Sequence, residues 1–254
     1  FNEIAILKKK LKINFMKKKI VITGGTGRFG NELKGIKTKH KLFFPTKKQL
    51  NILKINSITK YFKKTKPDVV IHLAGLSRPM ELHEKNIIKS INLNIIGTAN
   101  VTIACSKKNI KLIYFSTNYV YPGVKGNYNE HNSLKPFNNY AWSKLGGECS
   151  VQLYKNSLIL RVSMTEKPFV HKKAFANVKT SFAYQHEVAR ILFKLLNKKG
   201  IINVGGKAQY IYNFAKKENK KVKKIYQSKK SKVKIPFDSS INIKKLKKII
   251  KLKS

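Results

Sequence analysis

Short continuous apolar runs alternate along this chain with longer amphipathic stretches. Such runs are typical of strands covered on both faces of a parallel sheet, and the stretches between them have the length of covering helices. We expect strands at residues 20–23, 41–44, 68–73, 112–116, 157–161 and 201–204, and helices at residues 29–37, 57–64, 85–107, 140–154 and 185–197. The alternation predicts an α/β fold with a doubly wound parallel sheet.

A glycine-rich turn joins the first predicted strand to the first predicted helix. It reads TGGTGRFG, and Gly24, Gly27 and Gly30 stand three residues apart. Glycines at this spacing allow a tight turn, close approach of the backbone to a pyrophosphate, and close packing of helix on strand. The N–H groups at the start of the helix then face the anion. Because it lies between a strand and a helix, the turn favours a Rossmann-type dinucleotide site over a simple loop.

The segment after the second predicted strand bears on which dinucleotide would bind. An NAD site usually has a carboxylate there, which binds the ribose diol. This chain has no acidic residue between Glu32 and Asp68. A 2′-phosphate would suit Thr46 and Lys47 better, with Arg28 of the glycine turn in reach, so NADP(H) is expected in preference to NAD(H). Since lysine is abundant throughout the chain, NAD(H) stays an alternative.

A second candidate site lies on the helix predicted at residues 140–154. Tyr140 and Lys144 are four residues apart and share one face of that helix. A neighbouring ammonium would lower the pKa of the phenol from about 10 and let Tyr140 exchange a proton with an alcohol oxygen. Thr117 follows a predicted buried strand, at the sheet edge where open α/β folds bind ligands, and its hydroxyl can hydrogen-bond a carbonyl. Without Thr117, the pair would fit an ordinary exposed helix face equally well.

Composition adds a strong positive charge to this picture. The chain has 254 residues, a formal net charge of +44, and only four arginines among its 55 Lys and Arg residues. Proteins that read bases or phosphates favour the arginine fork, and no zinc-finger, helix-turn-helix or RNP-like pattern is present. The charge therefore indicates a compositional bias towards lysine and no specific nucleic-acid partner. The densest run, residues 216–253, could still hold polyanions without specificity.

The remaining features bear on compartment and domain organisation. No stretch reaches the roughly 18 uninterrupted apolar residues of a membrane span, so no membrane helix is expected. Cys105 and Cys149 are too few for a disulfide framework and form no metal-type pair, which suits a reduced cytoplasm. Residues 1–15 lack a signal-peptide pattern and are expected outside the fold. Residues 16–163 should form the dinucleotide-binding core, and residues 164–254 a reduced substrate lobe with late core elements and a lysine-rich tail.

Together these motifs resemble the extended short-chain dehydrogenases/reductases, and among them the dTDP-4-dehydrorhamnose reductase-like sugar-nucleotide enzymes. The matching pieces follow the order of that family: TGGTGRFG, PDVVIHLAGLSRP, IYFSTNYVYPG, NNYAWSKLGGE and LILRVS. They extend over about residues 17–163. The chain departs from the family at Asn118, where an acid is common, and in the short stretch after Arg161, so the substrate lobe is expected to be trimmed.

The resemblance implies NADPH-dependent reduction of a nucleotide-activated 4-keto-6-deoxysugar. Tyr140 would be the general acid, Lys144 would tune it and hold the nicotinamide ribose, and Thr117 would position the carbonyl. The residues assigned to the cofactor are Gly24, Thr26, Gly27, Arg28, Phe29, Gly30, Thr46, Lys47, Leu73, Ala74, Gly75, Tyr140 and Lys144. The residues assigned to the substrate are Ser77, Asn118, Tyr119 and Arg161.

Two other functions stay open, and a homodimer is a further expectation. One is an NAD-dependent epimerase or dehydratase of the same superfamily, in which the cofactor is reduced and reoxidised within one turnover. The other is a regulatory subunit that binds a dinucleotide without catalysis. A regulatory protein has no need for Thr117, Tyr140 and Lys144 together, which disfavours this second alternative. No metal is expected.

Overall fold

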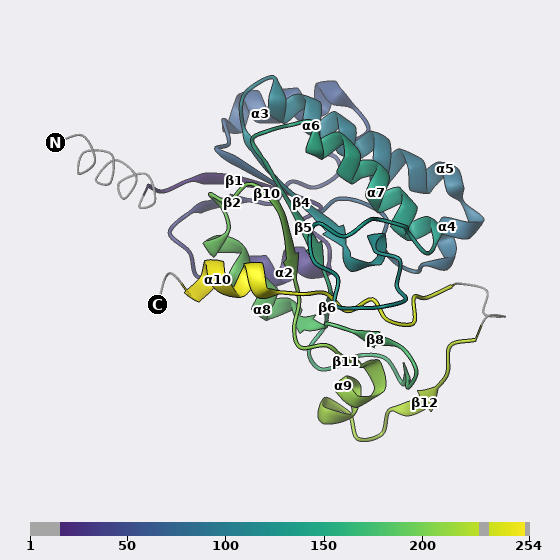
Figure 1. Ribbon diagram of the computed structural model, residues 1–254. Coiled ribbons are helices and arrows are strands. Elements are labelled where there is room, and N and C mark those ends of the chain that lie inside the picture. Colours follow the sequence, from purple (N-terminus) through teal and green to yellow (C-terminus); the bar gives the residue numbers. More distant parts are fainter. Residues whose placement is uncertain (1–15, 229–233, 252–254) are drawn as a thin grey trace.

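A six-stranded parallel sheet forms the centre of the protein. The computed structural model describes residues 16–228 and 234–251; the extension expected at residues 1–15 lies outside the described residues. The strands are β1 (Lys19–Thr23), β2 (Lys41–Phe43), β3 (Val69–His72), β4 (Lys111–Thr117), β5 (Ser157–Val162) and β10 (Gly200–Val204), in the order β10-β5-β4-β3-β1-β2 (Figure 1). Every neighbouring pair is parallel. The six predicted strands and the doubly wound α/β fold are confirmed.

Helices cover both faces of this sheet. On one face lie α2 (Arg28–Lys34), α8 (Gln185–Lys194) and α10 (Lys244–Lys251), and on the other α3 (Ile55–Thr65), α6 (Gly97–Ser106) and α7 (Asn139–Gln152) (Figure 1). Alternate residues of a strand therefore enter different cores: Ile20 and Ile22 pack against the first set of helices, and Val21 against the second. Because both faces are buried, the strands read as continuous apolar runs.

Where one helix was predicted at residues 85–107, residues 81–106 form a series of shorter segments. They are α4 (Glu81–Lys85), α5 (Ile87–Ser90), the π-helical η1 (Ile91–Ile96) and α6. Asn86 separates the first two, because its side chain accepts a hydrogen bond from the backbone N–H of Lys89 and so caps α5. The run Ile87–Ser106 is long and apolar enough to cross a membrane by length and composition. In this fold it lies against α3 and α7, with the side chains of Asn94 and Thr98 buried.

The order of the strands places a crevice between β1 and β3. The chain leaves β1 for β2 on one side and then crosses back to β3 on the other side of β1. The loops that follow β1 and β3 therefore diverge at the carboxyl edge of the sheet. Open α/β sheets bind their ligands at such a reversal of strand order.

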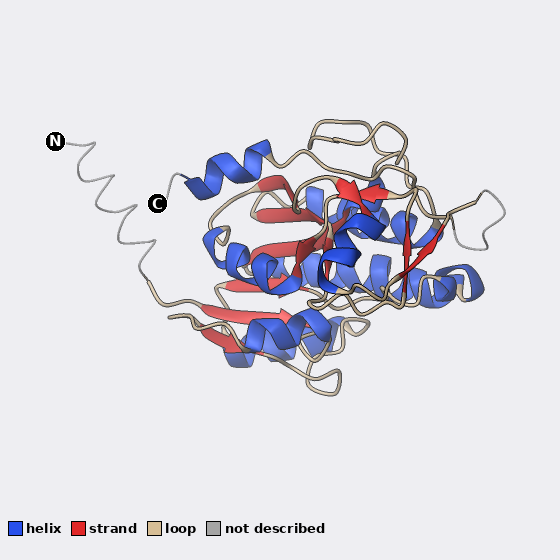
Figure 2. Cartoon of the chain, turned by 90° about the horizontal axis from the view of Figure 1, so that it is seen from below, coloured by secondary structure: helices blue, strands red, loops and turns tan. Residues whose placement is uncertain are grey.

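A small lobe lies beyond the carboxyl ends of the main strands (Figure 2). Its short elements are β6 (Met164–Thr165), β7 (Lys173–Phe175), β8 (Lys179–Thr180), β9 (Ala183–Tyr184), β11 (Gln209–Tyr210), α9 (Ile211–Glu218) and β12 (Lys223–Ile225). Phe169, Val178 and Phe214 form its own apolar cluster. Between these pieces the chain returns to the core through α8 and β10. The lobe and the late core elements interleave along the sequence. The boundary between core and lobe at residue 163 therefore stays a prediction.

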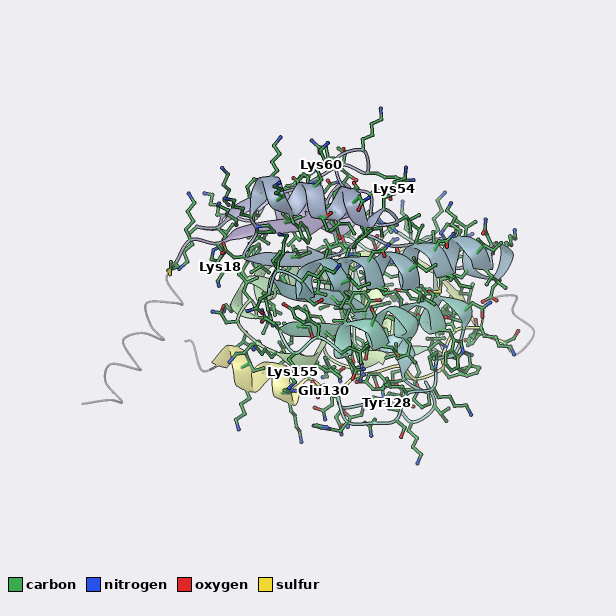
Figure 3. All side chains as sticks on the ribbon, turned by 90° about the horizontal axis from the view of Figure 1, so that it is seen from above. Lys18, Lys54, Lys60, Tyr128, Glu130 and Lys155 are labelled. Atoms are coloured by element: carbon green, nitrogen blue, oxygen red, sulfur yellow. The ribbon has the colours of Figure 1, made fainter. Side chains whose placement is uncertain are left out.

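The lysines surround this core. Basic side chains project around the outline of the molecule in Figure 3, and Lys54, Lys60 and Lys155 are exposed. Lys111 differs, since it is buried and its ammonium donates a hydrogen bond of 2.6 Å to the carbonyl of Lys198. Burial, helped by nearby lysines, lowers the pKa of Lys111 to about 8. Exposed lysines at most positions agree with a compositional bias.

Candidate functional site

A cavity of about 830 Å³ opens at the carboxyl edge of the sheet. It is lined by the glycine turn after β1, the loop after β3, the end of β4 and the first turns of α7. Met164, Phe182 and Gln185 close it from the side of the lobe. Its volume lies in the range of small-molecule and cofactor sites. The cavity therefore occupies the crevice that the strand order predicts.

The glycine turn can have this shape only with glycine at particular positions. Gly24 has a φ of +68°, and a Cβ atom there would lie 2.6 Å from the backbone nitrogen of Ala74. The turn after β1 and the loop after β3 therefore touch, backbone to backbone. A Cβ on Gly30 would run into the backbone of Gly25, so the start of α2 also packs tightly on the turn. The resulting cradle of exposed backbone suits the pyrophosphate of a dinucleotide, as its spacing predicts.

Asn94 holds the loop after β3 in place. Its side chain accepts a hydrogen bond of 2.7 Å from the backbone N–H of Leu76 and donates one of 2.9 Å to the carbonyl of the same residue. It also donates to the hydroxyl of Ser143 on α7, at 2.8 Å. The π-helical η1 places this amide inward, between the loop and α7. Asn94 was not among the predicted site residues, and no local signal distinguishes it, because Asn92, Thr98 and Asn100 nearby are polar as well.

Thr117, Tyr140 and Lys144 all line the cavity. Thr117 ends β4, Tyr140 lies in the first turn of α7, and Lys144 follows one turn later. The helix begins where it does because the side chain of Asn138 accepts a hydrogen bond from the backbone N–H of Ala141. The hydroxyl of Thr117 acts on the phenol of Tyr140 and lowers its pKa. The structure thus brings together three residues that the sequence separates by up to 27 positions.

The pKa of Tyr140 is raised, not lowered as we expected from its neighbour Lys144. Burial raises it, and the Thr117 side chain and the charge of Arg78 offset this only in part. The phenol is therefore protonated at neutral pH, and a protonated phenol is a proton donor. The ring of Tyr140 is held edge-on by His83 and Tyr119, at centroid distances of 5.1 and 6.4 Å.

The pKa of Lys144 is shifted as well. Burial lowers its pKa to about 7, although the carboxylate of Glu148 opposes that shift. Its ammonium lies over the ring of Tyr114, 4.2 Å from the centroid. Near neutral pH this residue can therefore change its charge in response to a ligand.

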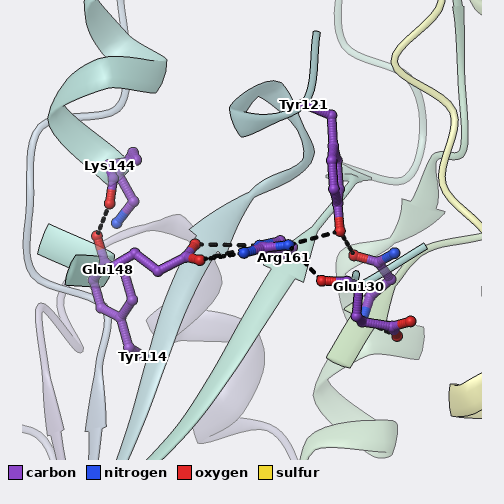
Figure 4. A network of polar contacts seen from close by, with 7 residues as sticks. Tyr114, Tyr121, Glu130, Lys144, Glu148 and Arg161 are labelled. Carbon is purple, nitrogen blue, oxygen red and sulfur yellow. Dashed lines mark hydrogen bonds and ion pairs between the residues drawn. The ribbon is translucent and has the colours of Figure 1, made fainter. Parts of the chain in front are cut away.

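Arg161 does not contact the cavity, so its assignment to the substrate was wrong. Its guanidinium is 2% exposed and pairs with the fully buried carboxylate of Glu148, with Nε 3.1 Å from Oε1 (Figure 4). It also donates a 2.9 Å hydrogen bond to the hydroxyl of Tyr121, which in turn donates to the side chain of Asn203. Glu148 comes one turn after Lys144. The sequence gives no sign that the strand directs Arg161 towards α7, where it fixes the helix to the sheet.

Most of the other predicted site residues also line the cavity. Those that line the cavity are Gly24, Thr26, Gly27, Arg28, Phe29, Gly30, Lys47, Leu73, Ala74, Gly75, Ser77, Asn118 and Tyr119. Thr46 does not line the cavity. It lies in an exposed turn, where its backbone N–H donates a hydrogen bond to the side chain of Gln49. The amide of Asn118 lines the cavity but donates to the carbonyl of Ser239, which links β4 to the lobe. Within the described residues, no group of three or more His, Cys, Asp and Glu could hold a metal ion.

The fold and the cavity define a Rossmann-type protein with a tyrosine and lysine pair at its ligand edge. The model of the RmlD substrate binding domain family matches residues 17–192, and the chain belongs to this family. Methionine adenosyltransferase 2 subunit beta from Bos taurus is 27% identical over 148 residues, which cover 55% of this chain and 44% of that protein. Spore coat polysaccharide biosynthesis protein SpsK from Bacillus subtilis is 31% identical over 150 residues, covering 57% and 52%. The chain spans about half the length of these relatives.

Solved structures share the whole architecture. The dTDP-4-dehydrorhamnose reductase of Bacillus anthracis, in complex with NADP, superposes with a TM-score of 0.82 at 24% identity, over 91% of this chain and 92% of that one. WbmG of Bordetella bronchiseptica, in complex with NAD, superposes with a TM-score of 0.69 at 18% identity, over 92% and 87%. At such identities the likeness shows the fold alone.

Proposed function

We propose that this chain binds a nicotinamide dinucleotide and reduces the ketone of a nucleotide-activated 4-keto-6-deoxysugar. The observation that carries the proposal is that Thr117, Tyr140 and Lys144 line the same cavity as the glycine turn. A protonated phenol thus shares one cavity with a backbone cradle for pyrophosphate. Membership of the RmlD substrate binding domain family and the fold shared with a dTDP-4-dehydrorhamnose reductase support a sugar nucleotide as the substrate.

The chain's own residues would do the acid-base work of this reaction. A bound NADPH or NADH supplies the hydride. Negative charge then grows on the ketone oxygen, and the phenol of Tyr140 gives it a proton. Thr117 and Arg78 stabilise the phenolate that remains, because both lower the pKa of Tyr140. Lys144 would bind the ribose next to the nicotinamide when its amine is protonated. A general acid placed in this way contributes about 10² to 10⁴ in rate.

NADP(H) is the cofactor we propose in preference to NAD(H). Lys47 lines the cavity close behind β2, and no acidic residue lies between Glu32 and Asp68 to bind a ribose diol. Thr46 does not line the cavity and has no part in this proposal. Structures with this fold hold NADP in one case and NAD in another, so the choice depends on these local residues. Titration with NADPH and NADH measures it directly.

Two relatives bear on the two alternative functions, the epimerase or dehydratase and the regulatory subunit. The dTDP-D-glucose 4,6-dehydratase of Dictyostelium discoideum is 32% identical over 185 residues, 58% of this chain and 42% of that protein, which supports the dehydratase alternative. The likeness to methionine adenosyltransferase 2 subunit beta, a protein named as one subunit of an enzyme, is in keeping with the alternative of a regulatory subunit. A dehydratase would retain NAD tightly and turn over without added NADPH. A non-catalytic subunit would bind a dinucleotide and show no turnover.

Replacement of Tyr140 by phenylalanine tests the proposed chemistry. The change keeps the ring that packs between His83 and Tyr119 and removes the proton. Turnover of a dTDP-4-keto-6-deoxysugar, followed by loss of NADPH absorbance, should fall by about 10² to 10⁴, while NADPH binding stays nearly unchanged. Tyr154→Phe is the matched control, because that hydroxyl bonds to the carbonyl of Ile110, away from the cavity. Equal turnover in Tyr140→Phe and the control would exclude Tyr140 as the acid.

We also propose that the chain forms a homodimer through an apolar helix face. Ile91, Ile96 and Ile103 are exposed on η1 and α6, and Trp142 is exposed on the adjacent α7. No charged residue lies between positions 90 and 106. Two copies, each with a formal charge of +44, repel one another least through such a face. Light scattering should therefore give a dimer for the wild type and a monomer for Ile103→Glu.

A further inference from the structure

Two arginines and a glutamate from three separate segments meet at the cavity. Arg28 begins α2 just after the glycine turn, Arg78 follows β3, and Glu166 follows β6 of the lobe. The Nη1 atoms of both arginines approach the same oxygen, Oε1 of Glu166, at 3.5 Å from Arg28 and 3.0 Å from Arg78. Both arginines line the cavity. One carboxylate oxygen therefore links both loops of the ligand crevice to the lobe.

Arginine is rare in this chain, and two of the four arginines belong to this cluster. Lysine supplies all but four of the 55 basic residues, and Arg161 is buried in a structural pair. Two of the other three arginines converge on one atom at the cavity. A guanidinium differs from an ammonium in its flat array of donors, which binds carboxylate and phosphoryl oxygens through paired hydrogen bonds. The pair thus has the chemistry of a site for an oxyanion.

Glu166 fills this position with the chain's own oxyanion. Its side chain is 15% exposed, against 34% for Arg78 and 53% for Arg28, so the carboxylate is more buried than either guanidinium group and does not itself line the cavity. Burial alone would raise its pKa, yet the backbone and the two arginines hold the pKa below its usual value. Glu166 is therefore ionised at neutral pH. Two positive charges and one negative charge leave the cluster with a net positive charge, which attracts a further anion.

The cluster also lies close to the proposed proton donor. Burial raises the pKa of both Tyr140 and Tyr119, and the charge of Arg78 opposes that rise at both residues. A phosphoryl group held by Arg78 would therefore lie in the same cavity as Tyr140. The charge of Arg78 would then act on both the phosphoryl group and the phenol. The ion pair in the present structure also ties the lobe to the core across that cavity.

We propose that Arg28 and Arg78 form a phosphoryl-binding position in the cavity, and that Glu166 occupies it until a phosphorylated ligand displaces its carboxylate. The inference rests on the proposed function only in that the ligand carries a phosphoryl group. That group can come from the diphosphate of the dinucleotide or from the diphosphate of the nucleotide sugar. Displacement of Glu166 also releases the lobe from the two loops, so binding and opening of the cavity are coupled.

Calorimetric titration of the full chain with inorganic pyrophosphate tests this position without any turnover. Glu166→Gln removes the internal competitor, so pyrophosphate should bind up to about fivefold more tightly, the worth of one partly exposed ion pair. Arg78→Gln removes a charge-assisted donor and should weaken binding at least about tenfold. Glu218→Gln is the matched control, because Glu218 pairs with Lys167 in the same lobe and not with an arginine of the cavity. It should leave the affinity unchanged.

The same titration with NADH, NADPH and dTDP identifies the source of the phosphoryl group. A gain in Glu166→Gln for both dinucleotides supports the cofactor diphosphate, and a gain confined to dTDP supports the sugar nucleotide. Unchanged or weaker pyrophosphate binding in Glu166→Gln, with a melting temperature equal to that of the control, would overturn the proposal. Absence of pyrophosphate binding in the wild type would also overturn it. Failure of NADPH to bind a wild type that still binds pyrophosphate counts against the proposed function alone.

Discussion

The pair between Arg161 and Glu148 gives a prediction whose magnitude follows from the structure. Glu148→Gln keeps the shape of the side chain and removes its charge. The guanidinium of Arg161, 2% exposed, keeps its bonds to Tyr121 and to the carbonyl of Glu130 but loses the carboxylate that neutralises it. Removing one partner of a buried pair costs about 3–5 kcal/mol. Because the amide oxygen of glutamine still accepts one hydrogen bond, we expect the lower end, about 3 kcal/mol.

Thermal unfolding followed by circular dichroism measures this loss. For a chain of this size, about 3 kcal/mol corresponds to a fall in melting temperature of roughly 6–12 °C. Glu81→Gln is the control, since Glu81 and Lys85 form an exposed pair at 3.8 Å and such pairs contribute only a few tenths of a kcal/mol. The double variant Glu148→Leu with Arg161→Met should recover most of the loss, because it leaves no buried charge unpaired. A fall in Glu148→Gln no larger than that of the control would refute the reasoning.

Two further predictions concern the glycine turn and the active-site lysine. Gly24→Ala should abolish dinucleotide binding, and it should lose more stability than Gly200→Ala. Both positions have positive φ, so a side chain costs about 1–2 kcal/mol at either. Only at Gly24 would the methyl group also meet backbone atoms, those of Ala74. Equal losses in the two variants would contradict the close contact of the two loops. The pKa of Lys144 is lowered to about 7 in the folded chain from 10.5, so the unfolded chain binds more protons between these values and stability should rise with pH there. Between pH 7 and pH 9 the gain in the free energy of unfolding is at most about 2 kcal/mol, since solvent reaches the cavity. Chemical denaturation should show no such gain for Lys144→Met.

Much of the fold followed from the sequence, for a local physical reason. A strand covered on both faces is apolar at nearly all positions, so all six strands of the sheet were predicted to within one or two residues. The glycine turn was recognisable because positive φ and backbone contact at Gly24 exclude other residues. A reduced lobe was expected after residue 163, but its strands were not predicted, because they are two or three residues long and have no periodicity of their own. Their partners, such as β7 and β12, are distant in sequence.

The sequence by itself determined the residue types of the candidate site and the strand or helix that carries each. Thr117, Tyr140 and Lys144 could be named because strand ends and helix faces follow from local pattern. Only the tertiary structure decided their electrostatics, since the pKa of a group depends on burial and on charges brought close by the fold. It alone showed that Tyr140 is raised in pKa, that Arg161 pairs with Glu148 away from the cavity, and that Glu166 meets Arg28 and Arg78. These partners stand from 13 to 138 positions apart, and no local pattern relates residues at such separations.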